Sequence, residues 1–323
     1  MLRILFGIAV VAFMVWGGYW FAGSRVLDRA VSDWIAETPA FSADDVAVRG
    51  FPNRFDVTLT RPAWADGATG WQAPFAQAFA LSYRPHHLIA VLPNDQTITL
   101  GGQDWAVFSE DMRASFYTRP RTDLELERAT LVVAAPRLRG PQGEALQAAE
   151  ARLASRADED DPLRHAVGVE ILSLRIDPAL RAVIDPAGAL PAKLERLHID
   201  AEVDLDRIAA LRMAEPPRPL AITLRDARLD WGGLSLAMEG ALRADAGGLV
   251  SGDLEARVTN WRLLLDAARA AALWDEGMDP MITALLGGLA REDGDEATLT
   301  LPLRLDRGML YLGPFALARV PAI

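Results

Sequence analysis

Between Asp45 and the C-terminal end, apolar and polar side chains alternate in a succession of short runs. Successive side chains of a β-strand point to opposite faces, so each run predicts a strand with one apolar and one polar face. Prolines and glycines separate the runs, as turn residues do. In the first half the predicted strands cover 56–60, 75–83, 87–92, 97–100, 105–107, 114–117, 124–126 and 130–134.

The second half continues the pattern with longer runs. Gly232-Gly233 and Gly247-Gly248 separate three of them, as tight hairpins require, which predicts a three-strand meander. The predicted strands cover 169–176, 194–205, 221–231, 234–243, 249–259, 298–305 and 309–317. Residues 144–156 fit either a helix or a strand, because their alanines permit both.

Two amphipathic helices are predicted near the C-terminal end. The first follows Asn260 as its cap, and the second follows Asp279-Pro280 and ends at 293–295. Apolar residues recur at helical spacing in both. They are Trp261, Leu264, Leu265 and Ala268, and then Ile282, Leu285, Leu286 and Leu289. A shorter helix is predicted within 178–191, around 180–184.

The N-terminal segment is a run of 18 uncharged residues, Ile4 to Phe21. As a helix it measures about 27 Å, close to the hydrocarbon thickness of a bilayer. Trp16, Tyr19 and Trp20 lie where an interfacial aromatic belt is found, and Arg3 precedes the run. The segment therefore predicts a membrane anchor with a cytoplasmic N-terminus and an exported body.

Two other interpretations of this segment stay open. Ala22-Gly23-Ser24 offers small residues for cleavage of a signal peptide, although the apolar run exceeds the usual length. A buried core helix also fits an apolar run. Residues 25–40 continue with one apolar face until Pro39, which predicts a linker helix.

The predicted fold is thus mainly β with a few helices, an α+β chain. Antiparallel meander sheets form a sandwich or a curved groove, two C-terminal helices cover it, and one transmembrane helix precedes it. The predicted units are an anchor at 1–24, a linker helix at 25–40 and a β-rich domain at 41–323. The proline-rich segment 216–219 is a possible division of that domain.

Composition excludes several classes of function. The formal net charge is −11, and the arginines are interleaved with acids, which argues against nucleic acid as a partner. The absence of cysteine excludes disulfides, thiol nucleophiles and cysteine-bound metals. The sequence also contains neither a Gly-x-Ser-x-Gly elbow nor a Gly-Lys-Ser phosphate loop.

Several short motifs together resemble one protein family. They are Gly50-Phe51-Pro52-Asn53-Arg54-Phe55-Asp56, Leu92-Pro93, Met112-Arg113-Ala114-Ser115, Leu310-Tyr311-Leu312-Gly313-Pro314-Phe315 and Val320-Pro321. In this order they resemble the bacterial family called domain of unknown function 2125. That family has no established activity, so it implies no catalytic residues. More distantly, 240–258 looks like the strand repeats of AsmA-like envelope proteins, which are associated with outer-membrane assembly and lipid traffic.

No residue pattern predicts a catalytic, cofactor or metal site. Adjacent His86 and His87 on a strand point to opposite faces, and His165 and His198 are isolated. The acidic run 158–161 lacks the spacing and glycine of a calcium loop, so a solvated turn is the simpler interpretation. Gly287-Gly288 indicates close helix packing or a kink.

The apolar strand faces carry the main functional hint. Such a face needs a second sheet, helices or a ligand to cover it. We therefore expect an inner-membrane protein with a periplasmic domain that handles lipid or assists envelope assembly. A scaffold that binds other envelope proteins is the alternative, and an exported hydrolase with dispersed acids is a third.

Overall fold

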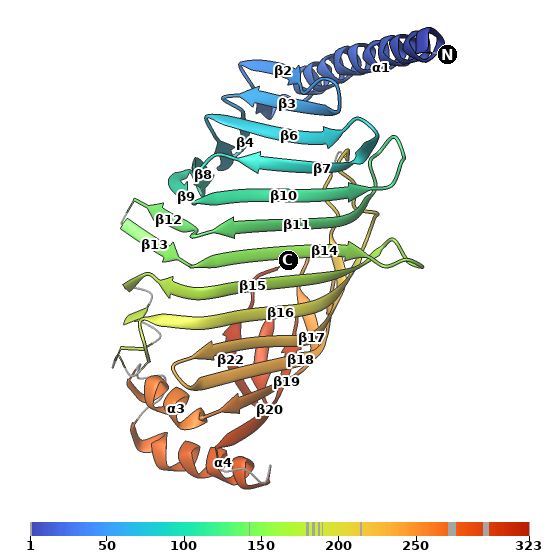
Figure 1. Ribbon diagram of the computed structural model, residues 1–323. Helices are drawn as coiled ribbons and strands as arrows, with labels where there is room; N and C mark the ends of the chain where they lie inside the picture. The colour runs from blue at the N-terminus through green and yellow to red at the C-terminus, as the bar shows by residue number, and fades with distance from the viewer. Residues whose placement is uncertain are drawn as a thin grey trace.

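The computed structural model describes residues 2–322, except 142, 179–180, 183–184, 187, 189, 214, 271–275 and 293–296. The described strands form one antiparallel sheet of 22 strands that is not closed into a barrel. A long helix leaves one end of this sheet, and two helices lie at the other end (Figure 1). The prediction of a mainly β fold between an N-terminal helix and two C-terminal helices is confirmed.

Most strands form a long curved layer that we call the floor. Adjacent floor strands follow one another in chain order, except that seven short strands of the chain belong to a second layer instead. The floor strands in spatial order are β2 (Asp45–Arg49), β3 (Arg54–Thr60), β6 (Phe75–Leu81), β7 (Arg84–Leu92), β10 (Asp111–Thr118), β11 (Leu126–Ala134), β14 (Glu150–Ala157), β15 (Arg164–Ile176), β16 (Lys193–Leu205), β17 (Pro219–Trp231), β18 (Leu234–Ala244), β19 (Val250–Thr259), β20 (Thr298–Asp306), β21 (Met309–Leu312) and β22 (Phe315–Arg319).

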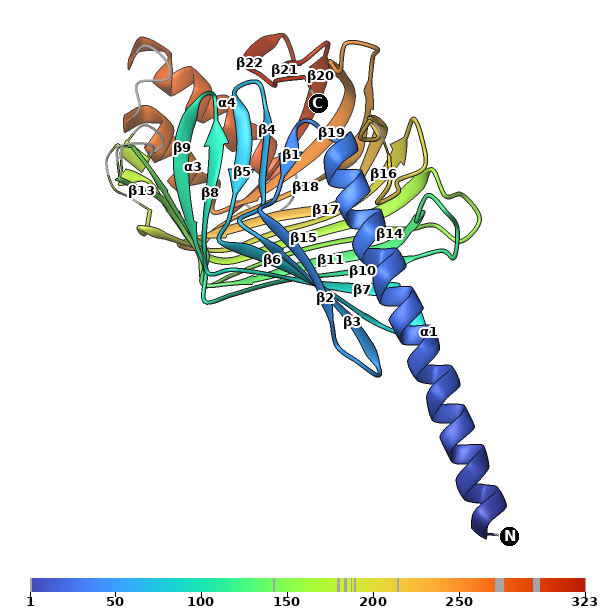
Figure 2. The same cartoon turned by 90° about the horizontal axis from the view of Figure 1, so that it is seen from above.

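The omitted strands form a second layer, which we call the wall. They pair with one another in order, and the last of them joins the floor at β15. Figure 2 shows the wall rising from one side of the floor, so that the two layers enclose a concave space. The wall strands are β1 (Phe41–Ser42), β4 (Ala63–Asp66), β5 (Thr69–Gln72), β8 (Asp95–Leu100), β9 (Gln103–Phe108), β12 (Arg137–Gly140) and β13 (Gly143–Gln147).

The corner between floor and wall is a line of bends within otherwise continuous strands. The backbone has a positive φ at Arg61 (45°), Ala135 (47°) and Ser173 (58°). Main-chain hydrogen bonds continue across the bend, for example from Arg61 N to the Pro74 carbonyl at 2.9 Å. Prolines at the corner do not interrupt the ladder, because they stand where a donor is not required.

The N-terminal helix α1 (Leu2–Glu37) joins the predicted anchor and linker into one element. Pro39 follows its end, as predicted. In Figure 2 its N-terminal half projects away from the sheet, while its C-terminal half lies beside β1 and β2. Trp34 of the helix contacts Phe41 of β1, with ring centroids 4.9 Å apart. Among the described residues, α1 is the one helix long and apolar enough to cross a membrane.

The two C-terminal helices are α3 (Trp261–Ala270) and α4 (Asp279–Glu292), and the short 3-10 helix η1 (Glu276–Met278) precedes α4. Asn260 lies directly before α3, as predicted, and its side-chain amide donates to the Gly233 carbonyl at 2.6 Å. Trp261 and Leu265 of the predicted stripe are buried, and Ala290 of α4 is 1% exposed. They pack on apolar residues of β15 to β20 and form the largest hydrophobic core.

Two loops meet on the side of the floor opposite the wall, and we call this pair of loops the strap. The connection between β10 and β11 meets the connection between β16 and β17, with Leu126 N donating to the Ala209 carbonyl at 2.8 Å. β14 and β15 lie between these strands in the sheet, so the second connection passes over their ends. The carboxylate of Glu125, which is buried, pairs with Arg119 at 3.0 Å and with Arg121 at 3.4 Å.

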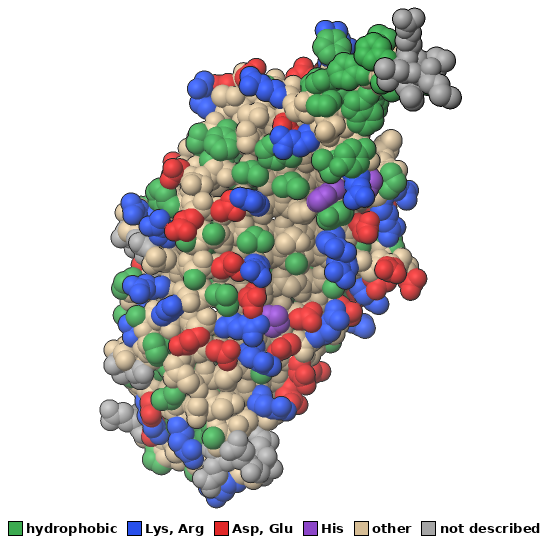
Figure 3. All heavy atoms as spheres, viewed as in Figure 1, with side chains coloured by type: hydrophobic (Ala, Val, Ile, Leu, Met, Phe, Trp, Pro, Cys, Tyr) green, Lys and Arg blue, Asp and Glu red, His purple; other side chains and the backbone are tan. Residues whose placement is uncertain are grey.

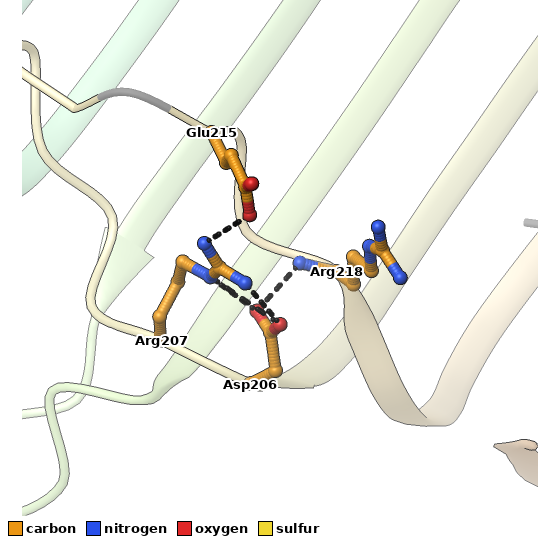
Figure 4. Close-up of polar contacts among 4 residues, drawn as sticks. All are labelled: Asp206, Arg207, Glu215 and Arg218. Carbon is orange, nitrogen blue, oxygen red and sulfur yellow. Dashed lines mark hydrogen bonds and ion pairs between the residues drawn. The ribbon is translucent and has the colours of Figure 1, made fainter. Parts of the chain in front are cut away.

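A polar cluster fixes the base of the strap (Figure 4). Asp206 Oδ1 accepts from Arg218 N at 2.8 Å, and Arg207 bridges Asp206 and Glu215, at 3.1 and 2.8 Å. The Arg218 N–H and the Arg207 guanidinium hold the pKa of Asp206 below its usual value. The predicted boundary at 216–219 lies in this connection, and the strands on either side of it are hydrogen-bonded neighbours.

The structure differs locally from the predicted elements. Residues 144–156 form strands, β13 and β14, so the helical alternative is wrong. The expected strand 309–317 is two strands, because Gly313 (φ 55°) turns the chain between β21 and β22. Most of the helix expected around 180–184, and the predicted break at 293–295, lie outside the described residues.

Candidate functional site: an open apolar groove

The central feature of the floor is a row of apolar side chains that runs across thirteen consecutive strands. Each member is the direct cross-strand partner of the next, so all of them share one face. The row, from β2 to β20, is Val48, Val57, Ala78, Ala90, Ala114, Leu131, Leu153, Val169, Ile199, Ala227, Met238, Ala256 and Leu301.

Two parallel rows flank the central row at a spacing of two residues. One runs from Val46 on β2 through Met112 to Leu299 on β20. The other runs from Phe55 on β3 through Phe116 to Leu312 on β21, and its one polar side chain is that of Ser155. At about 4.8 Å between strands, twelve steps make the apolar band about 58 Å long.

Contacts across the corner place this band on the concave side. Gln96 on the wall donates through Nε2 to Sδ of Met112 on the floor at 3.2 Å. Trp71 of the wall donates through Nε1 to Oε1 of the same Gln96 at 2.8 Å. Since Met112 belongs to a flanking row, that row faces the wall. The wall directs further apolar side chains to this side, because Ile98 pairs with Trp71 and with Trp105. We call the enclosed space the groove.

The convex face of the floor has the opposite character. Arginines and acids are mixed over it in Figure 3, which shows that face. Arg152 on β14, Glu170 on β15 and His198 on β16 form a polar row, and Arg196 pairs with Glu170 at 2.7 Å. The prediction of one dry and one wet face therefore holds along the floor.

The groove is open in its middle and covered at its ends. Leu153 is 43% exposed and its neighbours Val169 and Ile199 are half-buried, whereas Ala256 and Leu299 beneath the C-terminal helices are each 2% exposed. At the other end, Trp20 of α1 stacks on Phe55, the first residue of its row, with centroids 6.0 Å apart. The groove thus runs from α1 to α3 and α4.

An apolar cavity of about 390 Å³ lies at the far end of the groove. Its lining comes from α3, α4 and β19 to β22, and includes the exposed Leu264 and Leu285 from the two predicted helix stripes. Part of each predicted stripe therefore faces this cavity instead of a packed core. Side chains of the central and flanking rows, Leu301 and Leu299, line it too.

The histidines singled out from the sequence lie apart. His87 stacks on Tyr117 at 3.9 Å between centroids, and its Nε2 lies 3.1 Å from Ser115 Oγ. Adjacent His86 is exposed, and His198 belongs to the convex face. In the described part of the chain, no group of three or more His, Asp or Glu side chains is placed to hold a metal.

Sequence reasoning missed a serine–histidine contact. Ser155 Oγ and His165 Nδ1 lie 2.9 Å apart on neighbouring strands beneath the strap. Burial lowers the pKa of His165, and its Nε2 has no hydrogen-bond partner among the described residues. The pair therefore lacks the acid that orients a catalytic histidine from its second nitrogen.

The acidic run 158–161 forms the turn between β14 and β15. Asp158 Oδ1 accepts from the backbone N–H groups of Asp160 and Asp161, at 2.9 and 3.1 Å, and these bonds lower its pKa. This geometry is that of an Asx-type turn. Gly287 lies in α4, where its carbonyl accepts from Arg291 Nε at 3.0 Å.

Comparison with known proteins gives one match. A family model described as "Uncharacterized protein conserved in bacteria (DUF2125)" matches residues 20–321. No curated protein and no solved structure matches the chain. The resemblance to this family predicted from short motifs is confirmed, and the more distant likeness to AsmA-like proteins stays a prediction.

Proposed function

Since the chain belongs to the DUF2125 family of uncharacterised bacterial proteins, we propose its function from its own geometry. It is a single-pass inner-membrane protein whose periplasmic domain binds phospholipid acyl chains along the groove. Through this binding it moves lipid or assists envelope assembly. The observation that carries the proposal is the central row, which crosses thirteen strands without one polar side chain.

The shape and chemistry of the groove fit a long apolar ligand. Soluble proteins rarely leave a contiguous apolar surface of this length uncovered. Each methylene group that an acyl chain moves from water onto such a surface contributes about 0.8 kcal/mol. The half-buried side chains in the middle of the groove leave room for this contact. The headgroup stays at the open mouth of the groove, in contact with water.

The anchor supports the proposed topology. Arg3 precedes the apolar segment of α1, which favours a cytoplasmic N-terminus. A body with a net charge of −11 has little attraction for anionic lipid surfaces. The covalent anchor is therefore what would hold the groove at a membrane.

We also infer that the protein acts by binding and not by catalysis. The single hydroxyl of the flanking row, Ser155, meets a histidine that has no orienting acid among the described residues. The likeness of 240–258 to AsmA-like strand repeats agrees with lipid handling as the proposed activity.

The test is photocrosslinking in intact cells with a benzophenone amino acid at Leu153 or at Ala154. Both residues are exposed and adjacent on β14, but Leu153 belongs to the groove and Ala154 to the convex face. Mass spectrometry of the full chain, extracted in mild detergent, then identifies each adduct. We expect phospholipid on the probe at 153 and little on the probe at 154.

Two outcomes would overturn the proposal. Equal lipid labelling at both positions would mean that membrane lipid reaches either face without a site. Protein adducts alone at 153 would mean that another chain fills the groove. That result would favour the scaffold alternative, which the five exposed residues of the edge strand β22 also suit.

A further inference from the structure

The turns at one end of the floor dock directly on the membrane-spanning part of α1. The β2–β3 turn packs Phe51 against Phe13 and Trp20, with centroids 6.2 and 5.3 Å apart. Gly17 lies beneath the same ring, where a side chain would touch it. The turn therefore contacts the helix on its apolar stretch and not on the charged part that follows.

Hydrogen bonds fix this contact at three levels of the helix. Trp16 Nε1 donates to the Pro52 carbonyl at 2.9 Å, and Trp20 Nε1 donates to the Arg54 carbonyl at 2.6 Å. Tyr19 Oη donates to the carbonyl of Ser82, in the β6–β7 turn, at 2.9 Å. The three bonds give partners to two turn carbonyls and to the carbonyl of the first β3 residue, which suits a site where water is scarce.

The two turns form one unit. Ser82 donates to the Asn53 carbonyl through its N–H at 2.9 Å and through its Oγ at 3.0 Å. Ser82 is 2% exposed, whereas the neighbouring Tyr83 and Phe51 are 59% and 49% exposed. The unit thus presents two aromatic rings outward, beside a helix that carries no charge at this level.

The length of the helix sets the depth of these turns. The uncharged stretch between Arg3 and Arg25 has 24 − 3 = 21 residues, or about 31 Å, which is close to the ~30 Å of hydrocarbon that it has to cross. Gly17, at the level of Phe51, lies eight residues before Arg25, or about 12 Å along the axis. A typical tilt of about 20° changes this depth by less than ~1 Å.

We propose that the β2–β3 and β6–β7 turns form a membrane-docking surface whose partner is the bilayer itself. Phe51, at the level of Gly17 and about 12 Å inside the Arg25 end of the apolar stretch, enters the acyl chains. Tyr83 lies nearer the headgroups, toward which the exposed Arg84 extends. The first strands of the groove then stand at the lipid surface. This inference rests on the insertion of α1 and not on what the groove holds.

The experiment uses the absence of cysteine in the native chain, so each variant carries one labelling site. Full-length Tyr83→Cys, Met14→Cys, Leu153→Cys and Leu100→Cys proteins are labelled with an environment-sensitive fluorophore and placed in phosphatidylcholine–phosphatidylglycerol nanodiscs. Doxyl lipids with the quencher near the headgroup or deep in the chain report depth. Leu100 is 46% exposed at the tip of the β8–β9 hairpin of the wall and is the matched exposed control.

We expect the probe at 83 to emit at shorter wavelength than the probe at 100 in the same nanodiscs, and to be quenched by the doxyl lipids at a depth between the headgroups and the probe at 14. The probe at 14 should be quenched most by the deep doxyl group. The probe at 100 should keep the emission of a solvent-exposed fluorophore and should not be quenched by either doxyl lipid. A probe at 83 that behaves like the probe at 100 overturns the docking surface. The probe at 153 separates the two proposals. If lipid quenches the probe at 153 while the probe at 83 stays in solvent, the result supports groove binding and rejects the docking surface.

Discussion

A charge placed in the middle of the groove should weaken lipid binding far more than the same charge on the convex face. Leu153 is 43% exposed, so an acyl chain has that fraction of its side chain left to cover. Full burial of a leucine contributes about 1.5–3 kcal/mol, and 43% of this is about 0.6–1.3 kcal/mol. Leu153→Ala should therefore weaken binding about 3- to 9-fold, since about 1.4 kcal/mol is tenfold in affinity.

Leu153→Glu should have a larger effect. The carboxylate loses water when an acyl chain covers it and gains no partner, which costs at least a further ~1–3 kcal/mol. The total loss in affinity is then on the order of 10²-fold. Native mass spectrometry of the full chain with titrated phospholipid measures it. The fold should persist, because the new side chain can reach water when no ligand is bound.

Ala154→Glu is the matched control, since it adds the same group to the next residue on the opposite face. Its bound-lipid fraction should equal that of the native chain. The reasoning fails if both glutamates lower lipid binding equally, or if neither does while both proteins keep the native circular dichroism spectrum.

Three further predictions concern the framework of the groove. Glu125→Gln should destabilise the chain by about 1–3 kcal/mol in urea unfolding and speed hydrogen exchange in 119–126 and 206–213, because it removes the charge that Arg119 and Arg121 hold. Ala135→Gly should stabilise by up to about 1 kcal/mol, because φ is 47° there, whereas Ala134→Gly in the adjacent strand should destabilise. His165→Gln should flatten the dependence of stability on pH. Burial lowers the pKa of His165 in the folded chain, so the unfolded chain binds the proton at higher pH than the folded chain does. The free energy of unfolding of the native chain therefore declines below about pH 6.5, and that of the variant should decline less.

Most floor strands and the two C-terminal helices could be predicted because their signals are local, whereas β4, β5 and β12 of the wall were not predicted. Alternation in 194–205 marks β16, and glycine pairs mark the turns on either side of β18. The corner could not be predicted in the same way. Pro62, Pro74, Pro93 and Pro136 were expected in turns between strands, but they lie at bends within the sheet. Proline lacks an N–H in either place, so its presence alone does not distinguish a hairpin turn from a corner.

The groove depends on contacts that sequence patterns do not contain. Each strand predicts its own apolar face, but the rows exist only because thirteen strands keep a register that aligns those faces. The strap joins Leu126 to Ala209, and the Ser155–His165 contact needs the pairing of β14 with β15. The dry faces therefore indicated an apolar surface, while its direction, length and open middle follow from the sheet as a whole.

Side-chain size varies along the central row. Ala78, Ala90 and Ala114 follow one another on the strands nearest α1, whereas Leu131 and Leu153 follow farther along. The central row therefore has smaller side chains near α1 than in its middle. The edge of β2, which an open sheet would leave unpaired, lies against α1, so this helix also blocks strand addition there. The open sheet is thus protected at its α1 end without closing into a barrel, and in the proposed topology the groove begins beside the bilayer.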